Sequence, residues 1–252
     1  MGEILLSEAI KIIEKKTIPS EATMIIGLPD VGLVGLIATS YIISELNLEE
    51  IAYMESDLLP PVVVLHNGLP HAPLRMYGNQ NLIAVISELA VPAPAIYKIM
   101  WEIVNWAKEK KVKRIVSMGG IPLENRQTIK EPEVFGAASK QKLLDMLKKS
   151  GMKTMNEGYI VGAQALSMRY SLSKNVSAIA ILAQSFYNYP DPQAAAIALK
   201  ELSKISDIKV DVTKLLERGE EIRLKARDIM KRTQQEMNRM QKSQEYDLPL
   251  YV

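Results

Sequence analysis

The stretch TMIIGLPDVGLVGLIATSYIISEL (residues 23–46) decides the fold. Its first six residues form a short continuous apolar run, which is typical of a strand buried on both faces. Pro29 and Asp30 follow, and Asp30 is a residue type that often caps the start of a helix. A buried strand that runs directly into a helix is the building unit of an α/β protein with a parallel sheet.

The same alternation of strand and helix continues along the chain, with Pro and Gly residues at the boundaries. Further strands are expected at 51–56, 62–66, 74–78, 81–88, 113–120 and 176–184. Helices are expected at 92–111, 140–151, 162–174 and 192–205. This pattern predicts a three-layer α/β/α sandwich with a largely parallel sheet over residues 1–205.

The composition changes near residue 206. Residues 206–212 are interpreted as a connector, 213–245 as one long amphipathic helix, and 246–252 as a flexible tail. The apolar seam of the long helix is narrow and consists of Ile222, Ala226, Ile229, Thr233, Met237 and Met240. The seam can pack on its own domain or on another subunit, and we favour another subunit.

Composition excludes several classes of function. The 31 basic and 29 acidic residues give a net charge of +2, whereas a dedicated nucleic-acid-binding protein is usually far more basic. The absence of cysteine excludes disulfides, thiolate metal sites and a cysteine nucleophile. No apolar run approaches the ~20 residues that span a bilayer, and the first residues do not resemble a signal peptide. We therefore expect a cytoplasmic protein that binds neither nucleic acid nor membrane.

Two glycine-rich turns follow predicted strands. GLPDVGLVG (27–35) has neither the spacing of a dinucleotide-binding fingerprint nor that of a P-loop, and Asp30 would repel a phosphate. We interpret its glycines as close strand–helix packing. In GGIPLENRQ (119–127), the side chains of Glu124, Asn125 and Arg126 can face a crevice at the strand ends, but such a group is more often solvated or locally paired than catalytic.

The remaining candidate sites have simpler structural explanations. His66 and His71 are too few for a typical zinc site without ligands at the right spacing. In YPDPQAAAIAL (189–199), Asp191 is expected to cap a helix whose first position is Pro192. Scattered arginines such as Arg75 and Arg169 form no obvious anion site. We predict no catalytic residue, cofactor or metal.

The sequence ends in DLPLYV, with Leu250, Tyr251 and Val252 as its last residues. The pattern hydrophobic–Tyr–any would arise by chance in about one chain in fifty of this composition, so alone it is only suggestive. A terminal carboxylate can be captured by a basic group or backbone amides in a pocket. The Tyr251 ring and hydroxyl and the Leu250 side chain would add contacts, and Pro249 would reduce the ordering cost.

Several motifs, in order, resemble the archaeal branch of the proteasome assembly chaperone family. They are IIGLPDVGLVGLIA, SMGGIP, VFGAAS, GYIVGAQAL and YPDPQAAAIALKEL. The resemblance covers roughly residues 4–240 and implies an α/β core of nucleoside-phosphorylase-like architecture with a trailing helix. The closing residues also resemble the tail by which proteasome activators and some of these chaperones dock between α subunits of the core particle. By that resemblance Leu250 is the hydrophobic element, Tyr251 the tyrosine and Val252 the bearer of the carboxylate.

The resemblance implies an ATP-independent, homo-oligomeric chaperone or activator of the proteasome, not an enzyme. Its partners would be proteasome α subunits and further copies of the chain. One alternative is a nucleoside phosphorylase-like enzyme, for which Arg126 and Glu124 are the only candidates in a suitable turn. A second alternative is a scaffold that recruits other chaperones through residues 213–245.

Overall fold

The structure, a computed structural model, describes residues 10–243. Strand β2 (Thr23–Gly27) lies near the centre of a nine-stranded sheet formed by the described residues. In spatial order the strands are β1 (Lys11–Glu14), β3 (Glu49–Glu55), β6 (Leu74–Gly78), β7 (Leu82–Ser87), β2, β8 (Arg114–Pro122), β11 (Ala178–Ser185), β9 (Val134–Ala138) and β10 (Lys153–Thr154).

The central strands β7, β2, β8 and β11 are parallel to one another, as the alternating pattern predicted. Toward the first edge, β6, β3 and β1 each pair antiparallel with their neighbour. On the other side β9 is antiparallel to β11 and parallel to β10. The sheet is therefore mixed rather than largely parallel, and the prediction holds for its centre only.

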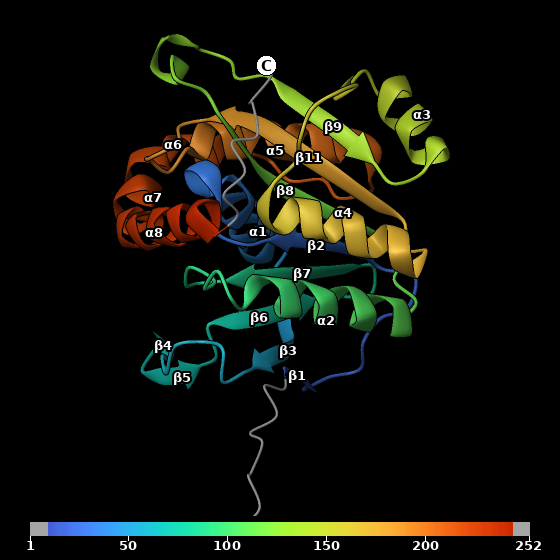
Figure 1. The fold of residues 1–252 in the computed structure, drawn as a ribbon, viewed down its shortest axis with the longest axis vertical. Coiled ribbons are helices and arrows are strands. Elements are labelled where there is room, and N and C mark those ends of the chain that lie inside the picture. Colours follow the sequence, from blue (N-terminus) through green and yellow to red (C-terminus); the bar gives the residue numbers. More distant parts are fainter. Residues whose placement is uncertain (1–9, 244–252) are drawn as a thin grey trace, which may run out of the picture.

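Helices cover both faces of the sheet, which confirms the three-layer arrangement (Figure 1). One face carries α1 (Val34–Glu45), α3 (Gln141–Lys149) and α5 (Pro192–Ile205), and the other carries α2 (Ile96–Glu109) and α4 (Gly162–Lys174). Successive side chains of β2 point to opposite faces of the sheet, so Ile25 packs into the core on the first face and Met24 and Ile26 pack into the core on the second.

The long helix predicted over 213–245 is wrong in two respects. The chain forms three consecutive helices, α6 (Thr213–Glu217), α7 (Gly219–Lys225) and α8 (Arg227–Ser243), which change direction at Arg218 and Ala226. Gly219, a poor helix former, starts α7 at the first break. The seam also packs on its own domain, where its residues Ala226 and Thr233 are buried together with the neighbouring Met230. The other half of α8 faces solvent.

Two further features complete the fold. The short strands β4 (Val64–His66) and β5 (Leu69–His71) form a separate hairpin at one end of the molecule (Figure 1). Within residues 10–243 no helix is both long and apolar enough to cross a membrane. The division of the chain near residue 206 and the nucleoside-phosphorylase likeness stay predictions.

Candidate functional site

The predicted docking residues Leu250, Tyr251 and Val252 lie outside the described residues. The structure does describe the element that leads to them. Helix α8 ends at Ser243, and six residues, 244–249, separate that point from Leu250. The placement of α8 on the domain is therefore the structural context of the tail.

Helix α8 lies across the carboxyl ends of the central parallel strands (Figure 1). The Glu236 carboxylate accepts a hydrogen bond from the backbone N–H of Ala93, in the segment after β7, at 3.0 Å. The Tyr187 hydroxyl, after β11, donates to Asn238 at 3.3 Å. Open α/β sheets usually bind ligands at this edge. Here the chain's own C-terminal helix occupies part of it.

Beneath α8, the first glycine-rich turn packs tightly. A Cβ on Gly27 would lie 2.2 Å from the Gly35 carbonyl oxygen, and one on Gly32 would lie 1.8 Å from the Ser185 Oγ. Gly32 also has a φ of 63°, a conformation that glycine adopts without cost. The interpretation of these glycines as packing positions is confirmed.

The Asp30 side chain does not cap the helix that follows it. Its Oδ2 accepts hydrogen bonds from the backbone N–H of Gly120 at 2.9 Å and from Gln164 Nε2 at 3.0 Å. The same Gln164 nitrogen donates to the Met118 carbonyl at 3.0 Å. Asp30 thus ties the turn after β2 to the end of β8 and to α4. Burial raises the pKa of Asp30 to about 8, although these hydrogen bonds oppose the shift.

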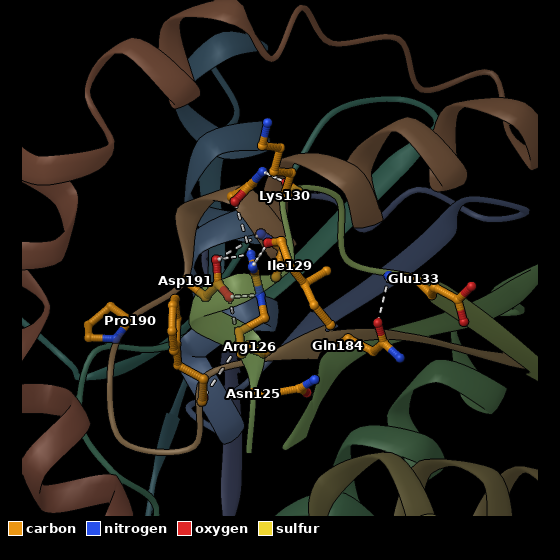
Figure 2. A network of polar contacts seen from close by, with 12 residues as sticks. Asn125, Arg126, Ile129, Lys130, Glu133, Gln184, Pro190 and Asp191 are labelled. Atoms are coloured by element: carbon orange, nitrogen blue, oxygen red, sulfur yellow. Dashed lines mark hydrogen bonds and ion pairs between the residues drawn. The ribbon is translucent and has the colours of Figure 1, made fainter. Parts of the chain in front are cut away.

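The second glycine-rich turn supplies a buried ion pair. Figure 2 shows Arg126 and Asp191 pointing toward one another, with Arg126 Nε 2.8 Å from Asp191 Oδ2 and Nη2 3.2 Å from Oδ1. Arg126 also donates to the Ile129 carbonyl at 2.7 Å and to Gln193 at 3.0 Å. Asp191 accepts from the Ala194 N–H at 3.0 Å, so its predicted capping role is confirmed.

The structure brings these motifs together but gives them structural roles. Arg126, which the enzyme alternative would use to bind phosphate, is saturated by Asp191 and its other acceptors. Glu124 and Asn125 are exposed on the same loop. The Arg126–Asp191 pair was not anticipated from the sequence, because 65 residues separate its members. The sequence feature that could have indicated this ion pair was a single arginine, Arg126, in the turn directly after a buried strand.

The two histidines are the last residues of β4 and β5, and their rings belong to a second polar cluster. The His66 ring lies 3.0 Å from Glu88, and the His71 ring 3.1 Å from Glu50. The buried Arg75 contacts Glu88 at 2.7 Å. Although two carboxylates are near, the described residues contain no group of three or more His, Asp or Glu side chains placed to hold a metal ion.

An open groove of about 930 Å³ adjoins this cluster. Its lining is mainly apolar and includes Pro60, Pro61, Val62, Val63 and Pro70. Lys15 and His71 are the basic side chains in that lining, and Lys15 is already paired with Glu50. This composition is poor for the convergent cationic contacts that a phosphate-dependent enzyme requires.

The fold defines the class of protein, which is an α/β protein with a mixed sheet. The carboxyl ends of its central strands, where such sheets usually bind ligands, are partly covered by the C-terminal helix α8. The chain belongs to the PAC2 family, whose model matches residues 24–230.

Solved structures and sequence relatives agree with this assignment. The crystal structure of Pyrococcus furiosus PbaA, an archaeal homolog of proteasome-assembly chaperone, is 28% identical with a TM-score of 0.85, covering 91% of this chain and 100% of that one. P. furiosus PbaB, an archaeal proteasome activator, is 22% identical with a TM-score of 0.73, covering 88% and 99% of the two chains, and it supports the fold alone. The uncharacterized protein MJ0106 of Methanocaldococcus jannaschii is 30% identical over 246 residues, 97% of this chain and 99% of that one.

Proposed function

We propose that this protein is an ATP-independent, cytoplasmic binding factor that docks on the α-ring of the proteasome core particle and assists its assembly or activation. The observation that carries the proposal is the likeness to PbaA over nearly the whole chain. The buried ion pair supports a binding protein over an enzyme, because Asp191, Ile129 and Gln193 already occupy the guanidinium of Arg126, the arginine that the enzyme alternative placed in a suitable turn.

In this proposal the docking element is the C-terminal tail. Leu250 would fill an apolar notch, Tyr251 would stack and hydrogen-bond at the socket rim, and the Val252 carboxylate would pair with a basic group or backbone amides. One short tail binds weakly, so the active form would be a homo-oligomer. Several tails on one oligomer raise the avidity by roughly 10²–10⁴ when their spacing suits the ring.

A binding experiment with recombinant proteasome α subunits tests the proposal. We expect deletion of residues 250–252 to abolish capture, and Tyr251→Ala to weaken it strongly. Gln244→Ala, a change upstream of the tail, is the matched control and should bind as the unmodified chain does. Light scattering and circular dichroism must show an unchanged oligomer and fold for each variant. Undiminished capture by the truncated chain would refute the tail mechanism.

A further inference from the structure

The outward face of α8 carries a row of basic side chains, which we call the basic stripe: Arg227, Lys231, Arg232 and Arg239. All four are exposed, whereas Met230 and Thr233 on the opposite face are buried. At about 100° per residue, the stripe falls within one arc of roughly 140° on the helix surface. The one acidic residue on that arc within the described side chains is Asp228.

The charge of the stripe is available to a partner. Arg227, Lys231 and Arg232 have no ion-pair partner among the residues whose side chains the structure describes. Arg239 pairs with Glu236 at 2.5 Å, but its side chain remains 70% exposed. Because the whole chain has a net charge of only +2, the stripe is a local feature and does not reflect a generally basic surface.

The domain holds this face in a fixed orientation. Two hydrogen bonds, one between Glu236 and Ala93 and one between Asn238 and Tyr187, fasten α8 to the domain. In α7, the Arg223 guanidinium donates to the Pro190 carbonyl at 3.2 Å. A charged face that is already ordered loses little conformational entropy when it docks, which favours its use as a recognition surface.

We propose that the basic stripe docks on an acidic protein surface of the partner that receives the C-terminal tail. This inference rests on the proposed function and adds a second contact to it. The stripe extends about 18 Å along α8 at 1.5 Å per residue. Arg239, the stripe residue nearest to the tail, is separated from Leu250 by four helical residues and residues 244–249, a path of at most about 30 Å, so the acidic surface that Arg239 meets must lie within about that distance of the tail socket.

The observations favour a protein partner over a nucleic acid. A nucleic-acid surface usually combines many basic residues from several elements with a strongly basic domain. The stripe has four members on a single helix, and acidic and basic residues are nearly balanced over the chain. Exposed charges at the edge of a protein–protein interface mainly accelerate the association of the two proteins and make its rate sensitive to salt.

The test compares two variants that lose the same charge. Arg227→Gln/Lys231→Gln/Arg232→Gln removes three charges from the stripe. Lys142→Gln/Lys148→Gln/Lys149→Gln removes three exposed charges from α3 and is the matched control. Association rates with immobilised α-subunit assemblies are measured by surface plasmon resonance at about 50 and about 200 mM salt, where the Debye length changes about twofold. Circular dichroism and light scattering establish that both variants retain the fold and oligomer.

We expect the stripe variant to associate about tenfold more slowly at low salt, with a smaller difference at high salt. The α3 variant should associate at the rate of the unmodified chain. If tail deletion abolishes binding while the stripe variant keeps the original rate and salt dependence, this inference alone fails. An equal loss in both variants would attribute the effect to net charge and would also overturn it.

Two other results separate the remaining possibilities. If the unmodified chain does not bind α subunits at all, the proposed function fails, and the stripe contact fails with it. If the unmodified chain binds a single-stranded oligonucleotide, and the stripe variant loses only that binding, the stripe serves nucleic acid and the protein contact is overturned.

Discussion

Two buried carboxyl groups, Asp30 after β2 and Asp191 after β11, have different partners that determine whether burial disfavours their ionised form. Asp191 receives the bidentate guanidinium of Arg126, with both side chains almost fully buried. The donors to Asp30 are amides, including those of Gly120 and Gln164, and no cation pairs with it among the described residues. Without a cationic partner, burial disfavours the ionised form of Asp30 and raises its pKa to about 8. Asp30 therefore links β2, β8 and α4 through a carboxyl group whose protonation, and so its contribution to stability, depends on pH.

This arrangement predicts a specific pH dependence of stability. The folded-state pKa of Asp30 is about 8 and its unfolded value is 3.8, so between these values the folded state binds more protons than the unfolded state. The free energy of unfolding contributed by this group should fall as pH rises from about 4 to about 8, by up to about 1.4 kcal/mol per pH unit. Urea unfolding across that range measures it.

Asp30→Asn isolates the contribution of this one group. The amide has nearly the same shape and can still accept from Gly120 and Gln164, but it cannot ionise. The variant should nearly match the unmodified chain near pH 4, where Asp30 is still largely protonated in both states, and should exceed it in stability increasingly as the pH rises to about 8. Since other carboxyl groups titrate equally in both chains, the difference between the two curves belongs to Asp30. Parallel curves over the whole range would contradict the prediction.

The sequence allowed some of these residue roles to be predicted and not others. Asp191 as a helix cap, and Gly27 as a packing position, follow from local rules about the residues on either side. The Arg126–Asp191 and Asp30–Gln164 contacts join residues 65 and 134 positions apart, and no local pattern encodes such a pairing. The fold alone brings them together.

At the scale of elements, local signals succeeded where a helix has clear ends. Helices α4 and α5 have the predicted bounds, 162–174 and 192–205. The three C-terminal helices were predicted as one, because charged residues continue without interruption through Arg218 and Ala226, where the helices break. The predicted seam also omitted Met230, which is buried on the same face as the seam residues Ala226 and Thr233.

Met230→Ala should loosen α8 without unfolding the domain. Loss of a buried methionine side chain typically costs about 2–5 kcal/mol, and a terminal helix can open locally at less than the global free energy. We expect faster hydrogen exchange over Arg227–Ser243, measured by mass spectrometry, with unchanged protection in β2 and β8.

Met237→Ala, at a half-buried position of the same helix, is the control and should have a smaller effect. If β2 and β8 lost protection together with α8, the helix would be part of the cooperative core. The claim that α8 packs on the carboxyl ends of the strands and opens independently of them would then be wrong.

At the scale of the whole molecule, the strand order could not be obtained from the sequence. The four parallel central strands follow from the βα alternation, but β1, β3, β6 and β9 each have an antiparallel neighbour, and their apolar patterns fit either direction of pairing. The final arrangement places α8, and with it the approach to the tail, at the carboxyl ends of the central strands. The proposed docking element therefore follows, in the sequence, a helix held at one defined edge of the domain.

Multivalency predicts how a detached tail should behave. A synthetic peptide with the sequence YDLPLYV contains every contact that the proposal assigns to the tail, but only one copy of it. It should displace the intact protein from α subunits only at a concentration roughly 10²–10⁴ times higher, calculated per tail. Fluorescence polarisation competition with labelled full-length protein measures this ratio.

The same peptide with alanine in place of the tyrosine separates tail recognition from nonspecific effects. It should not compete in the same range, because the ring contacts and hydroxyl hydrogen bond are lost while charge and length are kept. A parent peptide as potent per tail as the intact protein would show that each tail binds alone, and the homo-oligomer would then contribute nothing to affinity. If both peptides failed at all concentrations while the intact protein bound tightly, recognition would reside in the folded domain. The basic stripe of α8 would then be the first surface to test.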